Sequence, residues 1–294
     1  MPSPTRILAF VNENGANVAE ASAVLESAGA FDVRRISPSL LADEVRRAAS
    51  AGAERVLVAG GDGSIGTAAG SLSGTPTALA VLPAGTLNHL ARDLGLPDSL
   101  DEAVRVAQGA RRRTLDVGFV NGRAFLNTSS VGAYVSFVRR RDALERWMGY
   151  RLASVLAGIW LLRRLRTFRV TLEIEGQSCE YETPLVFVGV GERELKLPTL
   201  GKRVEAGQRG LHVMVLRTRS GARTLALALA AMARGVSAVA RTPALDAFIV
   251  DRVRIEARHA TREFHIAADG ELHRMEPPLE YSIVRDGLSV VVPT

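Results

Sequence analysis

Cysteine is almost absent from this sequence, because Cys179 is the only one among 294 residues. A single cysteine excludes an intrachain disulfide and any metal site built from several thiolates. This composition is typical of a reducing compartment, so we expect a cytoplasmic protein.

Long apolar runs are also missing. The longest, Leu152–Leu162 and Leu225–Ala233, fall short of the roughly 18 to 20 residues that a membrane span requires. No basic segment followed by an apolar one opens the sequence as a secretion signal would. We therefore expect no helix that crosses a bilayer.

Lysine is nearly as rare as cysteine. Lys196 and Lys202 are the only lysines among 37 basic residues, so arginine carries almost all of the positive charge behind a net +6. The planar guanidinium fork suits phosphate groups, and the charge balance fits a nucleic acid, an anionic membrane surface or a phosphorylated small molecule. An arginine-rich coding bias with solvated side chains explains the composition equally well.

The first third of the chain alternates strand and helix patterns, which is typical of βαβ units in a doubly wound, mostly parallel sheet. Such a sheet binds ligands beyond the carboxyl ends of its strands. The expected strands are Ile7–Val11, Phe31–Ile36, Arg55–Ala59 and Thr77–Leu82, and the expected helices are Ala16–Ala28, Leu40–Ala49, Ile65–Leu72 and Leu100–Gln108.

After Arg113 many short strand patterns predict an antiparallel sandwich as a second, β-rich domain. Helical patterns interrupt it at Val138–Arg166 and Thr224–Ala240. We expect an α/β fold with residues 1–118 as the N-terminal domain, completed by 280–294, and residues 119–279 as the second domain. The expected strands are Thr114–Val120, Ala124–Ser129, Phe168–Ile174, Leu185–Val190, Leu211–Leu216, Val253–Ala257, Glu263–Ala267, Leu279–Val284 and Leu288–Val292.

The most informative motif is Gly60-Gly61-Asp62-Gly63-Ser64, which follows a buried strand and precedes a helix. Glycines there let the backbone approach a bulky anion, and the amides at the helix start point toward it. A carboxylate at Asp62 stands where a metal bridging phosphate oxygens would bind. The alternative is a plain βα turn that uses glycine only for its tight geometry.

Two standard phosphate fingerprints do not explain this loop. Gly61, Gly63 and Gly66 satisfy G-x-G-x-x-G, but no acidic residue follows between Ser64 and Arg92 to bind a ribose. A Walker loop is excluded because the only Gly-Lys pair is followed by arginine.

A second motif, Pro83-Ala84-Gly85-Thr86-Leu87-Asn88, again lies where a strand gives way to a helix. Thr86 and Asn88 offer short hydrogen-bonding groups, and Gly85 leaves room for a ligand next to the backbone. Helix capping by Thr86 accounts for part of this pattern without any function.

Together these motifs resemble the catalytic domains of diacylglycerol kinases, a family related to sphingosine and ceramide kinases, and the likeness is greatest to its small bacterial members. The resemblance continues in the same order through Asp116-Val117-Gly118, Asn121-Gly122, Phe125-Leu126-Asn127, Ser129-Ser130-Val131-Gly132 and Asp269-Gly270-Glu271.

The resemblance implies an ATP-dependent lipid kinase that transfers a phosphoryl group to a lipid hydroxyl, such as that of diacylglycerol. ATP and Mg²⁺ are the implied cofactors, and the nucleotide is expected in a cleft between the two domains. The residues implied to bind the nucleotide are Asn12, Gly60, Gly61, Asp62, Gly63, Ser64, Ile65, Gly66, Gly85, Thr86 and Asn88.

Roles in catalysis and metal binding follow from the same resemblance. Asp62 and Asp116 are implied to bind the metal, Asp269 to act as the base and Glu271 to support it. Since Asp-Gly is also a favoured two-residue turn, Asp269-Gly270 can equally be read as part of a hairpin.

The implied partner is a lipid, with peripheral contact to the inner membrane surface and no nucleic acid. A homodimer is the default oligomer. Arginines flanking the apolar stripe of Leu152, Leu156, Ile159 and Leu162 suit a helix on an anionic membrane, but also a helix packed on its own domain.

The sequence also departs from the family pattern. Asn12 is followed by Glu13 rather than by proline, which weakens the expected adenine contact, and Gly66-Thr67 replaces an Asn-Glu pair. Arg209 stands where relatives carry an aspartate that helps to hold a structural metal, and arginine cannot bind Mg²⁺.

Two other functions remain open at this point. Gly-Gly-Asp-Gly also occurs in soluble-metabolite kinases of the NAD kinase and 6-phosphofructokinase type, although their second motif differs from Leu87-Asn88. A non-catalytic relative that binds a nucleotide or a lipid is the other alternative, prompted by Arg209.

Overall fold

The computed structural model describes residues 6–15, 17–85, 88–164, 167–193, 203–204, 206–217, 245–258 and 264–294. The chain divides into two compact units, and β5 (Arg112–Val120) and β16 (Leu279–Val291) contribute residues to both. Unit 1 contains Met1–Val117, Arg123–Leu126 and Val284–Thr294, and unit 2 contains Gly118–Gly122 and Asn127–Ile283.

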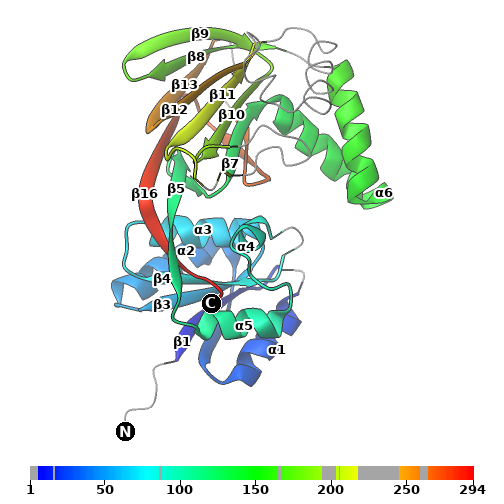
Figure 1. Ribbon diagram of the computed structural model, residues 1–294. Helices are drawn as coiled ribbons and strands as arrows, with labels where there is room; N and C mark the ends of the chain where they lie inside the picture. Colours follow the sequence, from blue (N-terminus) through cyan, green and yellow to red (C-terminus); the bar gives the residue numbers. More distant parts are fainter. Residues whose placement is uncertain are drawn as a thin grey trace. The chain divides into compact units, whose positions relative to one another are not determined.

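Unit 1 is built on a parallel sheet in the order β2-β1-β3-β4, with the end of β16 beside β4 (Figure 1). Its central strands are apolar on both sides, as expected for a sheet that helices cover on both faces. The four strands are β1 (Ile7–Asn12), β2 (Phe31–Ile36), β3 (Arg55–Gly60) and β4 (Ala78–Pro83).

The helices of unit 1 lie on the two faces of this sheet (Figure 1). Buried residues of α1 and α5 share one core with alternate residues of the strands, whereas α2 and α3 contact each other. These helices are α1 (Val18–Ala28), α2 (Pro38–Ser50), α3 (Asp62–Leu72), α4 (His89–Asp93) and α5 (Leu100–Gln108).

Local sequence explains where several of these helices begin and end. Pro38 opens α2 at a position where its missing N–H costs nothing. Asp101 and Glu102 lie in the first turn of α5, where the helix dipole favours negative charge. Gly29 ends α1 with a φ of 67°, a conformation that glycine adopts without strain.

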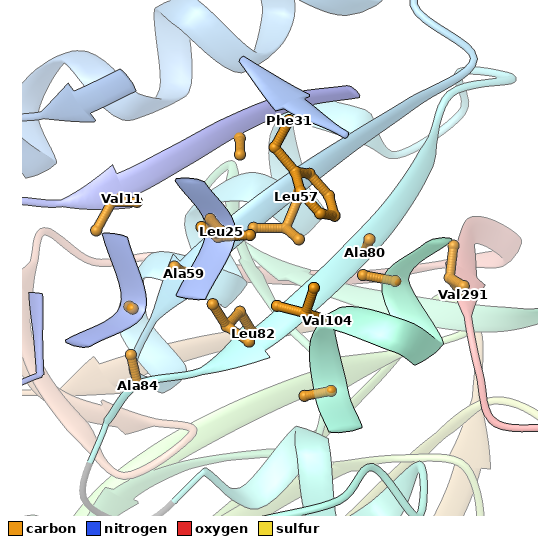
Figure 2. Packing of buried hydrophobic residues seen from close by; sticks show 14 of the residues in the cluster. Val11, Leu25, Phe31, Leu57, Ala59, Ala80, Leu82, Ala84, Val104 and Val291 are labelled. Atoms are coloured by element: carbon orange, nitrogen blue, oxygen red, sulfur yellow. The ribbon is translucent and has the colours of Figure 1, made fainter. Parts of the chain in front are cut away.

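Figure 2 shows the core on the α1 and α5 side of the sheet, where Leu25 and Val104 meet the strands. Leu57 and Ala59 alternate with Val56 and Val58 along β3, so both faces of this strand are buried. Burying apolar side chains on both faces is the main favourable term that holds the sheet and its helices together. Unit 1 therefore gives a rigid base for the turns at the carboxyl ends of β3 and β4.

Unit 2 contains two antiparallel sheets (Figure 1). The first joins β16, β13, β8 and β9 in that order, and the second has the order β12-β11-β10-β7-β14-β15. Their strands are β7 (Thr128–Gly132), β8 (Phe168–Ile174), β9 (Gln177–Thr183), β10 (Leu185–Val190), β11 (Leu211–Leu216), β12 (Leu245–Val250), β13 (Arg252–Arg258), β14 (Phe264–Ala268) and β15 (Glu271–Met275).

Buried polar contacts link the two sheets. The hydroxyls of Tyr281 on β16 and Ser129 on β7 lie 3.0 Å apart, and the Thr183 hydroxyl on β9 donates to the Leu216 carbonyl on β11 at 2.7 Å. Burial raises the pKa of Tyr281 well above its ordinary value, so the phenol stays protonated and can donate a hydrogen bond. The predicted α/β fold with an antiparallel, β-rich second part is confirmed.

The long helix α6 (Ala133–Arg163) belongs to unit 2 and is not straight (Figure 1). Gly149, with φ 75° and ψ 162°, breaks the helical backbone and divides α6 into two halves. No helix among the described residues is both long enough and apolar enough to cross a membrane.

Two strand predictions were wrong. The segment Ala124–Ser129 forms two strands, β6 (Arg123–Phe125) and β7, because the amides of Asn127 and Thr128 bond to a side chain instead of a neighbouring strand. The segments Leu279–Val284 and Leu288–Val292 form the single strand β16, although Arg285-Asp286-Gly287 has the composition of a turn.

Other elements were missed. Strands β9 and β15 are largely polar, and β12 and the short helix α4 were also not predicted. The helical pattern at Thr224–Ala240 lies outside the described residues.

Candidate phosphate site and acceptor site

Two βα turns approach each other at the carboxyl ends of β3 and β4 in unit 1. The amide of Ala84 donates to the carbonyl of Gly60 at 3.2 Å. A methyl group added to Gly85 would collide with Cα of Gly61. Glycine is therefore needed in the second turn, because the two backbones lie in contact.

The first turn leads directly into α3. Gly61 is its N-cap in an extended conformation, with φ −86° and ψ −177°, and no side chain caps the helix. The first amides of an α-helix have no partner within the helix, and the helix dipole adds partial positive charge there. Gly61 to Ser64 thus present backbone donors that suit a phosphate group.

Asn12 connects the end of β1 to this turn. Its Nδ2 donates to Oγ of Ser64 at 2.7 Å. A Cβ on Gly60 would lie 2.8 Å from the same hydroxyl, so glycine also makes room for this contact. Asn12 therefore lies at the predicted site and holds the loop in place.

Asn88 closes the second turn. Its Nδ2 donates to the carbonyl of Gly85 at 2.9 Å, and its Oδ1 accepts from the amide of Gly85 at 3.0 Å. Asn88 itself has a φ of 49°, a left-handed conformation that asparagine tolerates better than most residues. Both polar ends of this side chain shape the turn. Thr86, predicted to contact the nucleotide, lies outside the described residues.

The two aspartates predicted to bind metal have different surroundings. Asp62 is half-buried at the start of α3, and its Oδ1 lies 3.4 Å from the amide nitrogen of Leu90. Asp116 lies on β5, where its Oδ1 accepts from the amide of Asp286 at 2.9 Å. Within the described residues no group of three or more His, Cys, Asp or Glu side chains could hold a metal ion.

This donor set still fits Mg²⁺ in a nucleotide complex. Mg²⁺ keeps several waters and binds through one or two carboxylates together with substrate phosphates. Asp62, in the first turn of α3 beside the amides that suit a phosphate group, offers one such carboxylate. The role of Asp116 in the metal and water network stays a prediction.

In unit 2, Asp269 and Gly270 form the turn between β14 and β15. Ala268 pairs with Glu271, and both turn residues have positive φ, 47° and 87°. This is the two-residue hairpin that the Asp-Gly pair predicted.

The same aspartate also bonds to a distant part of unit 2. Oδ1 of Asp269 accepts from the amides of Asn127 and Thr128, both at 2.9 Å, and the Asp269 amide donates to the Thr128 carbonyl at 2.8 Å. A turn residue needs none of these contacts. They fix the direction of the carboxylate.

Arg193 supports this arrangement. Its guanidinium is buried and donates to Oδ1 of Asn127, to the carbonyl of Asn127 at 2.6 Å and to the carbonyl of Val190 at 2.7 Å. Its own amide donates to Nδ1 of His212 at 3.0 Å. Burial is the largest cause that lowers the pKa of His212, which favours the neutral ring that can accept this bond.

Sequence reasoning missed Arg193 and gave Asn127 no role. One signal was available in the sequence, because Arg193 follows shortly after the wholly apolar strand Leu185–Val190. An arginine that is buried beside such a strand needs several hydrogen-bond acceptors.

Glu271 differs from Asp269 in its surroundings. It begins β15, its side chain is half exposed, and its carboxylate lies 3.8 Å from Nε2 of His273. The two acidic residues do not share a strand face, because Asp269 lies in the turn.

Residues 6–120 match the model of the diacylglycerol kinase catalytic domain. This match covers less than half of the chain, and it shows that these residues are similar to the catalytic domain of diacylglycerol kinases. The matched range contains both glycine turns, together with Asp62 and Asp116.

Curated proteins that the chain resembles carry kinase names. The chain is 35% identical over 138 residues to the diacylglycerol kinase of Bacillus subtilis (strain 168), covering 45% of each protein. It is 42% identical over 119 residues to the "Probable lipid kinase YegS-like" of Chromohalobacter salexigens, covering 38% of each. The chain thus spans about half the length or less of these curated relatives.

The fold is shared over nearly the whole chain with crystal structures of Bacillus anthracis proteins named as diacylglycerol kinases. Two of them give TM-scores of 0.73 and 0.64, with 98% of this chain and 97% of theirs covered. At 20% and 18% identity, this likeness shows the fold alone.

Proposed function

We propose that this protein is a lipid kinase that transfers the γ-phosphoryl group of ATP to a hydroxyl of a lipid such as diacylglycerol. The observation that carries the proposal is the contact between the glycine turns at Gly61 and Gly85, within the residues that match the catalytic domain of diacylglycerol kinases. Phosphoryl transfer depends mainly on positioning and on neutralising charge.

In this proposal the turns of unit 1 bind the nucleotide phosphates. The amides from Gly61 to Ser64 donate to phosphate oxygens, and Asn12 and Asn88 keep the two turns in shape. Asp62 holds the Mg²⁺ that, when bound, neutralises charge on the transferred group. In this proposal, backbone amides contact the nucleotide phosphates, and Asp62 is the main side chain that takes part in binding.

The acceptor side lies in unit 2. Asp269, held by two backbone amides, takes the proton from the attacking hydroxyl as general base, and Glu271 supports it. Asn127 and Arg193 position Asp269 without touching the reacting atoms.

The family favours a lipid over a soluble acceptor. The curated relatives include a protein named as a diacylglycerol kinase and others named as lipid kinases. A lipid acceptor implies that the protein works at a membrane surface. We expect the protein to bind the cytoplasmic side of that membrane. A homodimer stays a prediction.

The test is to incubate the purified chain with γ-labelled ATP, Mg²⁺ and a bacterial lipid extract, beside NAD⁺ and fructose 6-phosphate as soluble acceptors. Label that moves to a lipid, identified by chromatography and mass spectrometry, supports the proposal. Label that appears in NADP⁺ or a sugar bisphosphate favours a soluble-metabolite kinase, and no transfer at all favours a non-catalytic relative.

A further inference from the structure

The second half of α6 exposes an apolar stripe. Leu152, Val155, Leu156 and Ile159 are 52%, 58%, 40% and 45% exposed. Single exposed apolar residues are ordinary, but a contiguous exposed group on one element marks a binding surface.

Helical geometry places these four side chains on one face. At 3.6 residues per turn they fall within an arc of roughly 100°. Ala153 and Ala157, which point elsewhere on the same helix, are fully buried. This half of α6 already has a face packed into its unit, so the exposed stripe is a second apolar face.

The charged residues in this half of α6 are all arginines. Between Tyr150 and Arg164 the sequence has no aspartate or glutamate. Arg163 falls on the same helical arc as the stripe, and both Arg163 and Arg164 are exposed. Arginine can lay its aliphatic stem along apolar groups while its guanidinium contacts phosphate.

The bend at Gly149 sets the stripe at an angle to the first half of α6 (Figure 1). Across this bend the guanidinium carbon of Arg140 lies 5.7 Å from the centre of the Trp160 ring, a cation–π contact that ties the two halves together. Trp147, 86% exposed, precedes the bend, and tryptophan is favoured at the interface between a membrane and water.

We propose that the stripe of Leu152, Val155, Leu156 and Ile159, with Arg163 and Arg164, docks this protein onto an anionic bilayer surface. The helix lies in the plane of the interface, its apolar side chains enter the acyl boundary, and the arginines bind lipid phosphates. A second copy of this chain is disfavoured as the occupant. A symmetric contact between two stripes would bring the arginines of both copies together, and like charges repel. The choice of a bilayer rests on the lipid acceptor proposed above, as well as on this charge.

Vesicle flotation without ATP tests the surface separately from catalysis. The full chain should float with vesicles of phosphatidylcholine containing about one third phosphatidylglycerol, and binding should weaken at high salt. Phosphatidylcholine alone should bind much less.

Two variants identify the surface. The double variant Leu156→Ser with Ile159→Ser should lower the affinity for anionic vesicles by roughly tenfold or more, and Arg163→Gln with Arg164→Gln should lower it and remove most of the salt dependence. The matched control is Leu40→Ser on α2 of unit 1, which is 55% exposed and should bind like the wild type.

Wild-type flotation by the serine double variant would overturn the proposal, as would equal binding to both vesicle types. A dimer in sedimentation that the same substitutions break apart would assign the stripe to a second copy instead. Kinase activity on detergent-dispersed lipid is measured in parallel. If vesicles bind but no lipid is phosphorylated, the lipid kinase assignment fails while the docking surface stands.

Discussion

The backbone amide of Asn127 donates a 2.9 Å hydrogen bond to Oδ1 of Asp269, which lies 142 residues further along the chain. The amide of Thr128 donates a second bond of the same length to the same oxygen. This pair of bonds gives the Asp-Gly hairpin a fixed carboxylate, so its turn geometry and its proposed catalytic role can be separated by mutation.

Replacing Asp269 with asparagine should remove catalysis and keep the fold. The amide oxygen of asparagine can still accept both backbone bonds, and asparagine is equally suited to the turn before Gly270. Without a general base, kcat should fall by about 10² to 10⁴. Calorimetry and steady-state kinetics check this, with the exposed Glu276→Gln as control.

The matching variant Asp269→Ala should also melt earlier, because the part-buried amides of Asn127 and Thr128 lose their acceptor, at about 1 kcal/mol for each. Near-normal kcat in Asp269→Asn would refute the assignment of the base.

Arg193 is predicted to act through Asn127. Arg193→Met leaves two carbonyls and the Asn127 side chain without their donor, so we expect a loss of about 3 kcal/mol or more in the free energy of unfolding. Arg193→Lys keeps the charge but cannot reach all three acceptors, and it should restore part of both stability and kcat.

A positioning role predicts a specific kinetic pattern for Arg193→Lys: kcat falls while KM for ATP stays unchanged, since the turns proposed to bind the nucleotide lie in unit 1. The rate is therefore expressed per folded molecule, and an unchanged kcat on that basis would show that Arg193 serves stability alone.

His212 should make stability depend on pH. Burial lowers its pKa in the folded state below the ordinary 6.5, with the positive Arg193 acting in the same direction and Glu192 opposing it. The unfolded chain then binds a proton more readily than the folded one, so this stability is complete above pH 6.5 and declines as the pH falls below it.

Melting temperatures from pH 7.5 down to 5.5 should therefore fall more steeply in the wild type than in His212→Gln. Glutamine can accept the bond from the Arg193 amide but does not titrate. Identical slopes in the two proteins would exclude this role for His212.

Gly85→Ala should weaken ATP binding by roughly tenfold or more, because the new methyl group pushes the second turn away from Gly61. Titration calorimetry with ATP measures the change. Gly158→Ala is the matched control, since nothing lies within 4 Å of the added methyl and alanine favours a helix. Unchanged ATP affinity in Gly85→Ala would mean that the two turns do not form one site.

Local patterns predicted most of unit 1 from the sequence. Strand Phe31–Ile36 and helix Leu100–Gln108 have the predicted bounds, because apolar periodicity and flanking turn residues determine them. Both glycine turns were also predicted, since each lies where a buried strand gives way to a helix.

Contacts between distant residues could not be predicted in this way. The break between β6 and β7 depends on Asp269, and the continuity of β16 depends on the bond from the Asp286 amide to Asp116. The buried position of Arg193 depends on acceptors at Asn127 and Val190 that only the folded chain brings together.

The most direct measurement compares the transfer of label from γ-labelled ATP to diacylglycerol by the wild type, by Asp62→Asn and by Asp98→Asn, an exposed control in the same unit. The wild type and Asp98→Asn should both produce labelled phosphatidic acid. Asp62→Asn should produce none, while melting at the wild-type temperature, because the half-buried carboxylate at the start of α3 is proposed to bind the metal and is not needed for packing. Transfer at the wild-type rate by Asp62→Asn would contradict the assignment of the Gly60–Gly66 loop as the phosphate site.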